Sequence, residues 1–136
     1  MTRAFALLAL ALAACTDAGT GVGSLTGTYT LRTINGDPVP ATLAFTSPSD
    51  HVELLEGQIR LASDGTYSDR TRVQETKRGV TTEYLDDTQG RWSVSGTALL
   101  LVDDADAANA TRGVIGGGRI TITGYGGTSA VAEFTR

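Results

Sequence analysis

The chain has 136 residues, a formal net charge of −4 and a single cysteine. This length suits one domain with a core of its own, and a lone cysteine excludes an intramolecular disulfide framework. The acidic balance argues against a nucleic-acid binder and against a polybasic membrane surface, because both need clustered positive charge. We therefore expect no nucleic-acid partner.

The N-terminus has the pattern of a secretory leader. A charged start at residues 1–3 precedes the uncharged run "AFALLALALAA" at 4–14. This run is too short to cross a bilayer core of about 30 Å, but it suits the apolar region of a signal peptide. Its last residues and the cysteine, Leu12-Ala13-Ala14-Cys15, resemble a bacterial lipoprotein signal. The alternatives are an ordinary signal peptide with an incidental cysteine, or a cytosolic protein with an apolar N-terminal helix.

The lipoprotein resemblance implies a location. Residues 1–14 would be removed, and Cys15 would carry lipid that holds the protein in a membrane. The next residue is Thr16 and not the aspartate that signals inner-membrane retention in some bacteria. The resemblance therefore favours the cell envelope, at the periplasmic face of the outer membrane. Residues 15–26 are rich in glycine, serine and threonine, which predicts a flexible tether between the lipid and a domain at 27–136.

The first half of that domain alternates apolar and polar residues. "GTYTLRTING" at 27–36 predicts a strand that ends in an Asn-Gly turn, and "ATLAFTS" at 41–47 predicts another after a proline-broken segment. "SDG" at 63–65 joins a strand to its return strand, and Lys77-Arg78-Gly79 predicts the next turn. Asp69 falls on the inward face with Tyr67, which the simple alternation does not explain.

The second half continues the pattern. "GRWSVSG" at 90–96 and "TALLLVDD" at 97–104 predict a hairpin, "ADAANATRG" at 105–113 a polar loop, and 114–136 two or three strands with glycine turns. We find no amphipathic helix. The fold class predicted is all-β, an antiparallel up-and-down meander of 8–10 strands that closes into a small barrel and so removes exposed edges. A β-sandwich is the alternative. The expected inward residues are Tyr29, Leu31, Ile59, Leu61, Tyr67, Val73, Tyr84, Trp92, Val94, Leu99, Leu101, Ile120 and Ile122.

Several segments in order resemble small lipocalin-like bacterial lipoproteins. They are the opening "GTYTLRTINGDPVPATL", the hairpin "GQIRLASDGTYS", the hairpin "GRWSVSGTALLL" and the closing aromatic followed by arginine, Phe134-Thr135-Arg136. Tyr29 stands where true lipocalins carry the tryptophan of their G-x-W motif. The resemblance covers nearly the whole domain and implies a lipocalin-like barrel at the cell envelope.

The residues point to little catalytic chemistry. His51 is the only histidine and Cys15 is assigned to lipid, so neither a zinc site nor a Cys–His pair can be assembled. We expect His51 at the surface, no metal, no cofactor and no enzyme activity. A carboxylate pair from Glu53, Glu56 and Asp69 would need the fold to bring them together. Turn or loop chemistry is expected for the remaining acidic groups, Asp86-Asp87 and the cluster of Asp103, Asp104, Asp106 and Asn109.

The barrel interior is the best candidate site, since a small barrel is either filled by side chains or holds one small ligand. We expect a monomeric, lipid-anchored envelope protein that binds a small apolar or amphipathic ligand without catalysis. The alternative is a structural or protein-interaction module with a solid core. Ligand-binding candidates combine interior aromatic residues with the mixed polar face of the middle hairpin: Tyr29, Tyr67, Thr71, Thr82, Tyr84 and Trp92.

Overall fold

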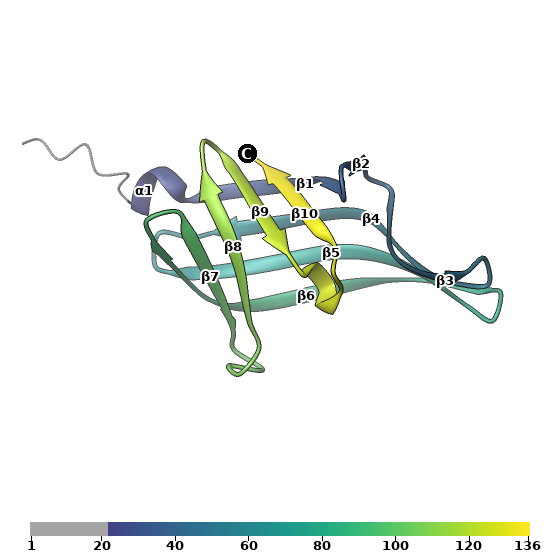
Figure 1. Cartoon of the computed structure of the whole chain (residues 1–136). Helices are drawn as coiled ribbons and strands as arrows, with labels where there is room; N and C mark the ends of the chain where they lie inside the picture. Colours follow the sequence, from purple (N-terminus) through teal and green to yellow (C-terminus); the bar gives the residue numbers. More distant parts are fainter. Residues whose placement is uncertain (1–21) are drawn as a thin grey trace, which may run out of the picture.

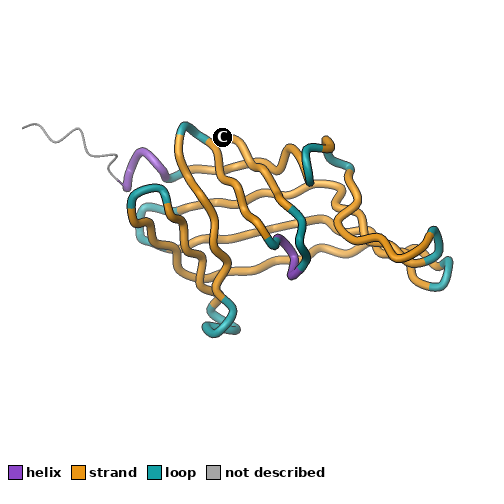
Figure 2. The backbone as a smooth tube through the Cα atoms, in the orientation of Figure 1, coloured by secondary structure: helices purple, strands orange, loops and turns teal. Residues whose placement is uncertain are grey.

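A computed structural model describes residues 22–136 of the chain. The expected signal peptide and Cys15 lie outside the described residues. Figure 1 shows a structure made almost wholly of strands, and Figure 2 marks its two short helices in purple. In chain order the elements are α1 (Val22–Leu25), β1 (Gly27–Ile34), β2 (Asp37–Pro38), β3 (Ala41–Ser47), β4 (Asp50–Leu61), β5 (Thr66–Lys77), β6 (Val80–Ser95), β7 (Ala98–Asp103), β8 (Ala110–Gly116), β9 (Arg119–Thr123), the 3₁₀ turn η1 (Tyr125–Gly127) and β10 (Val131–Thr135).

Strand β1 closes the sheet into a barrel. It pairs with β10 on one side and with β4 on the other, while β4 to β10 each pair with the next strand in the chain. The result is a closed ring of eight antiparallel strands, which confirms the predicted all-β meander and its closure into a lipocalin-like barrel. Closure satisfies backbone groups that would otherwise lie at an exposed sheet edge.

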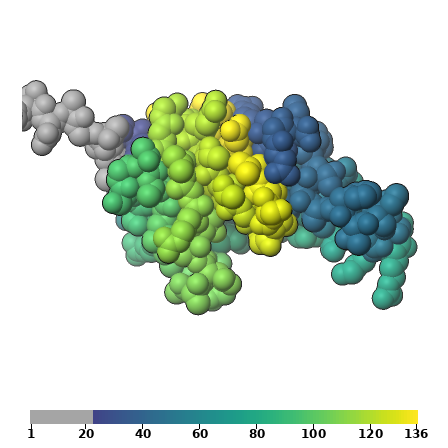
Figure 3. All heavy atoms as spheres, viewed as in Figure 1, coloured from purple at the N-terminus to yellow at the C-terminus, as the bar shows by residue number. Residues whose placement is uncertain are grey.

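Strands β2 and β3 lie outside the ring. β3 pairs with the first part of β4, from Ala41 opposite Leu54 onward, whereas β1 takes the last part of β4. β4, β5 and β6 are the longest strands among the described residues, so their ends continue past the ring and carry β3 with them. We call this projection, made of residues 41–54 and 73–84, the flap. Figures 1 and 3 show it extending away from the barrel on the right.

Predicted turns lie where the sequence indicated. Asn35 and Gly36 join β1 to β2, and both have positive φ, at 54° and 88°. This is the left-handed conformation that a two-residue hairpin of the Asn-Gly kind requires. Arg78 and Gly79 join β5 to β6 in the same way, with φ of 52° and 76°. The local turn chemistry therefore sets the register of two neighbouring strands in each case.

The closed half of the barrel is packed solid. Side chains that alternate inward from all eight ring strands meet there, and α1 covers the end with Leu25. The hydroxyl of Tyr29 donates a hydrogen bond to the carbonyl oxygen of Leu25 at 2.7 Å, and the Arg136 guanidinium lies 5.8 Å from the centre of the Tyr29 ring. α1 forms inside the segment expected as a tether. Across both halves of the described structure, the largest fully buried side chains are Tyr29, Leu31, Ile34, Leu54, Ile59, Leu61, Leu99, Ile115, Ile120, Ile122 and Phe134.

The structure corrects three local predictions. Tyr84 was expected inside the barrel but is 46% exposed, because β6 at that point has passed the ring and belongs to the flap. The pair Asp86-Asp87 was expected in a turn but lies within β6, where cross-strand pairing with Thr71 and Arg70 of β5 continues without a break. The polar stretch 105–113 was expected as a loop, but β8 begins within it at Ala110, since pairing with β7 starts there.

Candidate functional site

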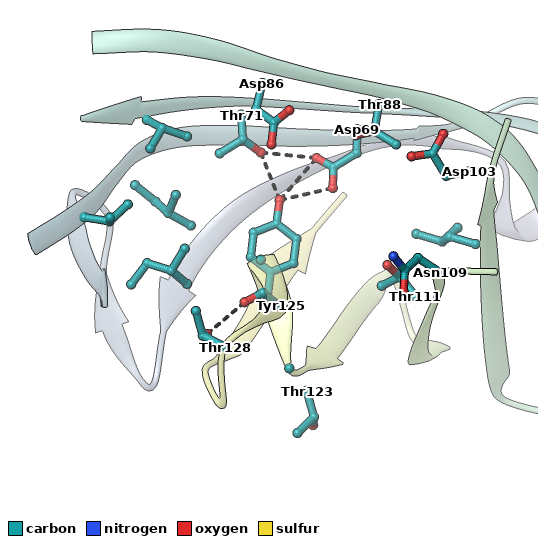
Figure 4. A pocket seen from close by; sticks show the side chains of 18 of the residues that line it. Asp69, Thr71, Asp86, Thr88, Asp103, Asn109, Thr111, Thr123, Tyr125 and Thr128 are labelled. Carbon is teal, nitrogen blue, oxygen red and sulfur yellow. Dashed lines mark hydrogen bonds between the residues drawn. The ribbon is translucent and has the colours of Figure 1, made fainter. Parts of the chain in front are cut away.

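The open half of the barrel holds a pocket of about 880 Å³. Its walls are β5 and β6, the adjoining ends of β7 and β8, the flap, and the loop that contains η1 (Figure 4). Pockets that take small organic ligands have volumes of roughly 300–1,000 Å³, so this one has the size of a ligand site. The barrel is thus solid at the α1 end and hollow at the flap end.

Strand register places an acidic row on one wall of this pocket. On β5 and β6, Asp69 lies opposite Thr88, and Thr71 lies opposite Asp86. Residues that face each other or lie two apart share a sheet face, so all four side chains point inward. On β7, Asp103 lies opposite Gly90 and shares that inner face. The wall therefore carries carboxylates from three neighbouring strands (Figure 4).

Asp69 is held by two hydroxyl groups. The Tyr125 hydroxyl lies 3.2 Å from Oδ1 and 3.1 Å from Oδ2 of Asp69, and the Thr71 hydroxyl lies 3.2 Å from Oδ1. The two hydroxyl oxygens are 2.9 Å apart (Figure 4). Tyr125 belongs to η1 and its ring packs edge-on against Phe134, with 5.5 Å between ring centres. The cluster therefore ties the η1 loop to β5 across the mouth of the barrel.

Burial shifts the pKa values of three groups in this region. Desolvation raises the pKa of Asp69 to about 6, and the charges of Asp86 and Asp87 act in the same direction, while the hydrogen bonds from Tyr125 and Thr71 oppose the shift. Desolvation also raises the pKa of Tyr67 to about 12, with Asp103 and Asp69 adding to it. The pKa of Tyr125 is raised for the same reasons, burial first and Asp69 second. Both phenols thus stay protonated near neutral pH and can donate hydrogen bonds.

The pocket has an excess of negative charge. Of the described residues that line it, Asp69, Asp86 and Asp103 are acidic and Arg112 is the one basic residue. Arg112 lies opposite Leu100, next to the inward Thr111, so alternation directs its side chain to the outer face of β8. The interior field is therefore set by the carboxylates, and a cation that entered would be attracted.

The apolar part of the pocket lining comes mainly from the flap. Leu43 of β3 reaches η1, where a Cβ built on Gly126 would lie 2.9 Å from its Cδ2 atom. Gly126 has a φ of 62°, so glycine suits both the backbone and the contact. The apolar lining is completed by side chains from the flap strands and by one from β7: Val52, Leu54, Val73, Tyr84 and Leu101.

The candidate residues fall into different environments. Tyr67, Thr71 and Tyr84 line the pocket. Tyr29 is buried at the α1 end, and Trp92 is buried with its indole N–H donating to the carbonyl oxygen of Ala62 at 2.9 Å. Thr82 is exposed on the flap.

Of the three carboxylates considered for an acid–base pair, Asp69 lines the pocket, whereas Glu53 and Glu56 do not. Glu56 makes an ion pair of 3.1 Å with Arg72 at the surface, away from Asp69. His51 lies on the flap beside Phe45, with 6.3 Å between ring centres.

Sequence reasoning did not single out Asp86, Asp103 or Tyr125 as members of the site. Asp86 lies two residues after Tyr84, and Asp103 lies two residues after Leu101. Because strand residues two apart share a face, the inward direction of both aspartates could be inferred from the sequence. Tyr125 gave no such signal because it lies in a glycine-rich turn. Its place in the pocket follows from tertiary contact with Asp69.

No protein-family model and no curated protein matches this sequence. Within residues 22–136, no group of three His, Cys, Asp or Glu side chains is arranged to hold a metal ion. No helix in that part of the chain is long and apolar enough to cross a bilayer.

Proposed function

We propose that this protein is a non-catalytic binder of a small amphipathic ligand, held at the cell envelope by lipid on Cys15. The observation that carries the proposal is the pocket of about 880 Å³ at the open end of a closed barrel. Its lining is acidic around Asp69 and Asp86 and becomes apolar along β5 and β6 toward the flap, which suits a molecule with one polar end and one apolar end. The lipocalin-like resemblance of the sequence supports the same type of function.

Binding is favoured over catalysis by how Asp69 is held. A carboxyl group with a pKa of about 6 in a pocket suits acid–base chemistry. Both oxygens of Asp69, however, already lie within hydrogen-bond distance of the Tyr125 hydroxyl, and Oδ1 also of Thr71. A catalytic base must reach the proton that it abstracts, and part of the hydrogen-bonding capacity of Asp69 is already used by Tyr125 and Thr71. We therefore assign this cluster to shaping the pocket.

Native mass spectrometry of the purified protein after exposure to a cell extract tests the proposed binding. We expect a retained small molecule, and we expect Thr111→Trp to abolish its retention because the indole would fill the pocket from β8. Val114→Trp is the matched control, since Val114 lies three residues along the same strand and is 57% exposed outside. Recovery of bare protein only, or equal retention by both variants, would contradict binding in this pocket.

The lipid anchor is a separate part of the proposal, supported by the sequence Leu12-Ala13-Ala14-Cys15. Two or more acyl chains anchor a protein stably, whereas one chain binds only marginally. We propose the periplasmic face of the outer membrane as the location, and a monomer as the state. Labelling with a radioactive fatty acid in the bacterial host tests the anchor. Wild type should incorporate label and Cys15→Ala should not, and equal labelling of both would refute it.

A protein-interaction module is the second candidate, and one observation favours it. Phe45 and Val80, at the flap, are 65% and 67% exposed, and Leu85 beside it is 54% exposed. Exposed apolar side chains that gather on a projecting element can mark a contact surface. Crosslinking in intact cells distinguishes this candidate: a flap contact would be lost in Phe45→Ser with Val80→Ser, whereas pocket binding would be kept.

A further inference from the structure

We propose that the ligand of this pocket is an amphipathic cation, with an ammonium or guanidinium head and an apolar body. The proposal rests on the proposed function, because it names the class of molecule that the same pocket binds. It is carried by the charge of the inward residues, by their spacing and by the position of the apolar wall.

Among the described residues, the inward carboxylates have no cationic partner, unlike their outward neighbour. Asp87 of β6 makes an ion pair of 2.9 Å with Arg70. Asp69, Asp86 and Asp103 take part in none of the ion pairs formed by the described residues. The contacts to Asp69 come from neutral hydroxyls, and Asp103 accepts a hydrogen bond of 2.7 Å from the backbone N–H of Ala105. A cation in the pocket would supply the opposite charge that residues 22–136 do not.

The spacing of these carboxylates favours an organic cation over a metal ion. Asp69 lies opposite Thr88, so Asp86 is its diagonal neighbour on the next strand. Diagonal neighbours in an antiparallel pair are about 7–8 Å apart at the backbone. No group of three acidic side chains in the described part of the chain is placed to ligate a metal. A head group with several N–H donors can reach two carboxylates at such a distance, because each N–H makes its own hydrogen bond.

The apolar wall fixes the direction in which the ligand lies. Along β5 and β6 the next inward pair beyond Thr71 and Asp86 is Val73 and Tyr84. Two residues of a strand span about 6.6 Å, so the apolar surface begins one pair beyond the acidic row. Leu43 continues this surface up to η1. A ligand with its head at the acidic row therefore extends its apolar body along β5 and β6 toward the flap.

The half-buried position of Asp69 supports this assignment. Its carboxylate is desolvated, which is why its pKa rises, and a bound cation would stabilise the charged form. The acidic groups that face it are Asp86 of β6 and, further along the wall, Asp103 of β7, while Tyr67 and Tyr125 remain neutral. Binding of a cation is therefore expected to release a proton near pH 6, whereas binding of an uncharged analogue is not.

Calorimetric titration of the full chain with three ten-carbon probes tests the proposal. Decylamine, decanol and decanoate share one apolar body and carry a positive, a neutral and a negative head. We expect decylamine to bind at least about tenfold more tightly than decanol, and decanoate to bind more weakly than decanol. Raising the salt concentration should weaken decylamine binding but leave decanol binding unchanged, because salt screens only the charged head.

Two variants locate the binding. Asp86→Asn with Asp103→Asn should reduce the preference for decylamine over decanol by at least about threefold, and circular dichroism checks the fold. Asp87→Asn makes the same kind of charge change on the outer face of β6 and should keep the preference. Equal affinity for decylamine and decanol, or loss of the preference in Asp87→Asn as well, would overturn the cation inference and leave the binding function standing. Failure of all three probes to bind would count against the proposed function itself.

Discussion

The Tyr125 hydroxyl lies 3.1 Å from Oδ2 of Asp69, although 56 positions separate the two residues in the chain. This contact joins the loop between β9 and β10 to the wall strand β5 across the barrel mouth. It also explains how a carboxylate can face the barrel interior, since hydroxyl donors replace part of the water that the group gives up. The stability of the open half thus depends on a polar cluster, whereas the closed half depends on apolar packing.

Asp69 should make stability depend on pH. Its pKa is about 6 in the folded protein against an ordinary value of 3.8, so the folded state binds the proton more tightly than the unfolded chain. The free energy of unfolding is therefore expected to fall as pH rises from about 4 to 6. Asp69→Asn should remove this slope and stabilise the protein at pH 7.5 by about 2 kcal/mol. Urea denaturation from pH 4 to 7.5 measures it, with Asp37→Asn on exposed β2 as control. An unchanged slope in Asp69→Asn contradicts the prediction.

Removing the Tyr125 hydroxyl should destabilise the protein most at neutral pH. Tyr125→Phe keeps the ring against Phe134 but leaves the Asp69 carboxylate with one donor fewer. Loss of a donor to this half-buried charged group should cost about 1–3 kcal/mol, and the cost should shrink at pH 4, where Asp69 is protonated. Denaturation at both pH values measures the effect. Tyr84→Phe on the flap should cost little, and equal losses for the two variants would argue against the cluster.

Gly90 is required by close packing between β6 and β7. A Cβ at this position would overlap the backbone carbonyl of Val102 and come within 2.9 Å of the Tyr67 ring. Because a backbone atom cannot move aside without disturbing the pairing of β6 and β7, Gly90→Ala should cost about 3 kcal/mol. Gly116→Ala on β8 is the control, since nothing lies within 4 Å of its Cβ position. Thermal melting compares the two, and similar melting temperatures would contradict the packing argument.

Arg136 should fasten α1 to the closed end. Its Nη1 donates to the carbonyl oxygens of Ser24 and Thr26 at 2.8 and 3.0 Å. Arg136→Gln is expected to destabilise the protein by about 1 kcal/mol and to speed amide exchange in residues 22–26 specifically. Arg119→Gln removes only an exposed ion pair of 3.8 Å and should leave that exchange unchanged. Faster exchange in both variants, or in neither, would contradict this role.

Much of the barrel could be predicted from local patterns, because alternation and turn residues act over a few positions. Asn35-Gly36 sets its hairpin by its own backbone preference, and the inward direction of Asp69 followed from its parity with Tyr67. The strand position of Asp86 and Asp87 could not be predicted in this way. Acidic residues are common in turns, and here pairing with a partner strand keeps the chain extended.

The site needed information that no local pattern holds. Tyr125 is surrounded by glycines that favour a turn whether or not its ring points inward. Its direction depends on Asp69 and Thr71, which lie far away in the sequence. The flap could not be predicted from local patterns either. It begins where β4 changes its pairing partner from β3 to β1, and only closure of the ring determines that point.

The unbroken pairing of β5 with β6 limits how a ligand can enter and leave. From Thr66 opposite Arg91 to Lys77 opposite Val80, every residue of β5 has a partner on β6 and no bulge interrupts them. This ribbon therefore holds one side of the flap firmly, whereas the pairing of β4 with β5 has an irregularity between Leu54 and Glu56, at the base of the flap. We expect entry and release to use the loop at the mouth, where Gly124, Gly126 and Gly127 flank Tyr125 and the hydroxyl cluster ties the loop to β5. The rate of ligand exchange would then be limited by the breaking of the hydrogen bonds among Asp69, Thr71 and Tyr125.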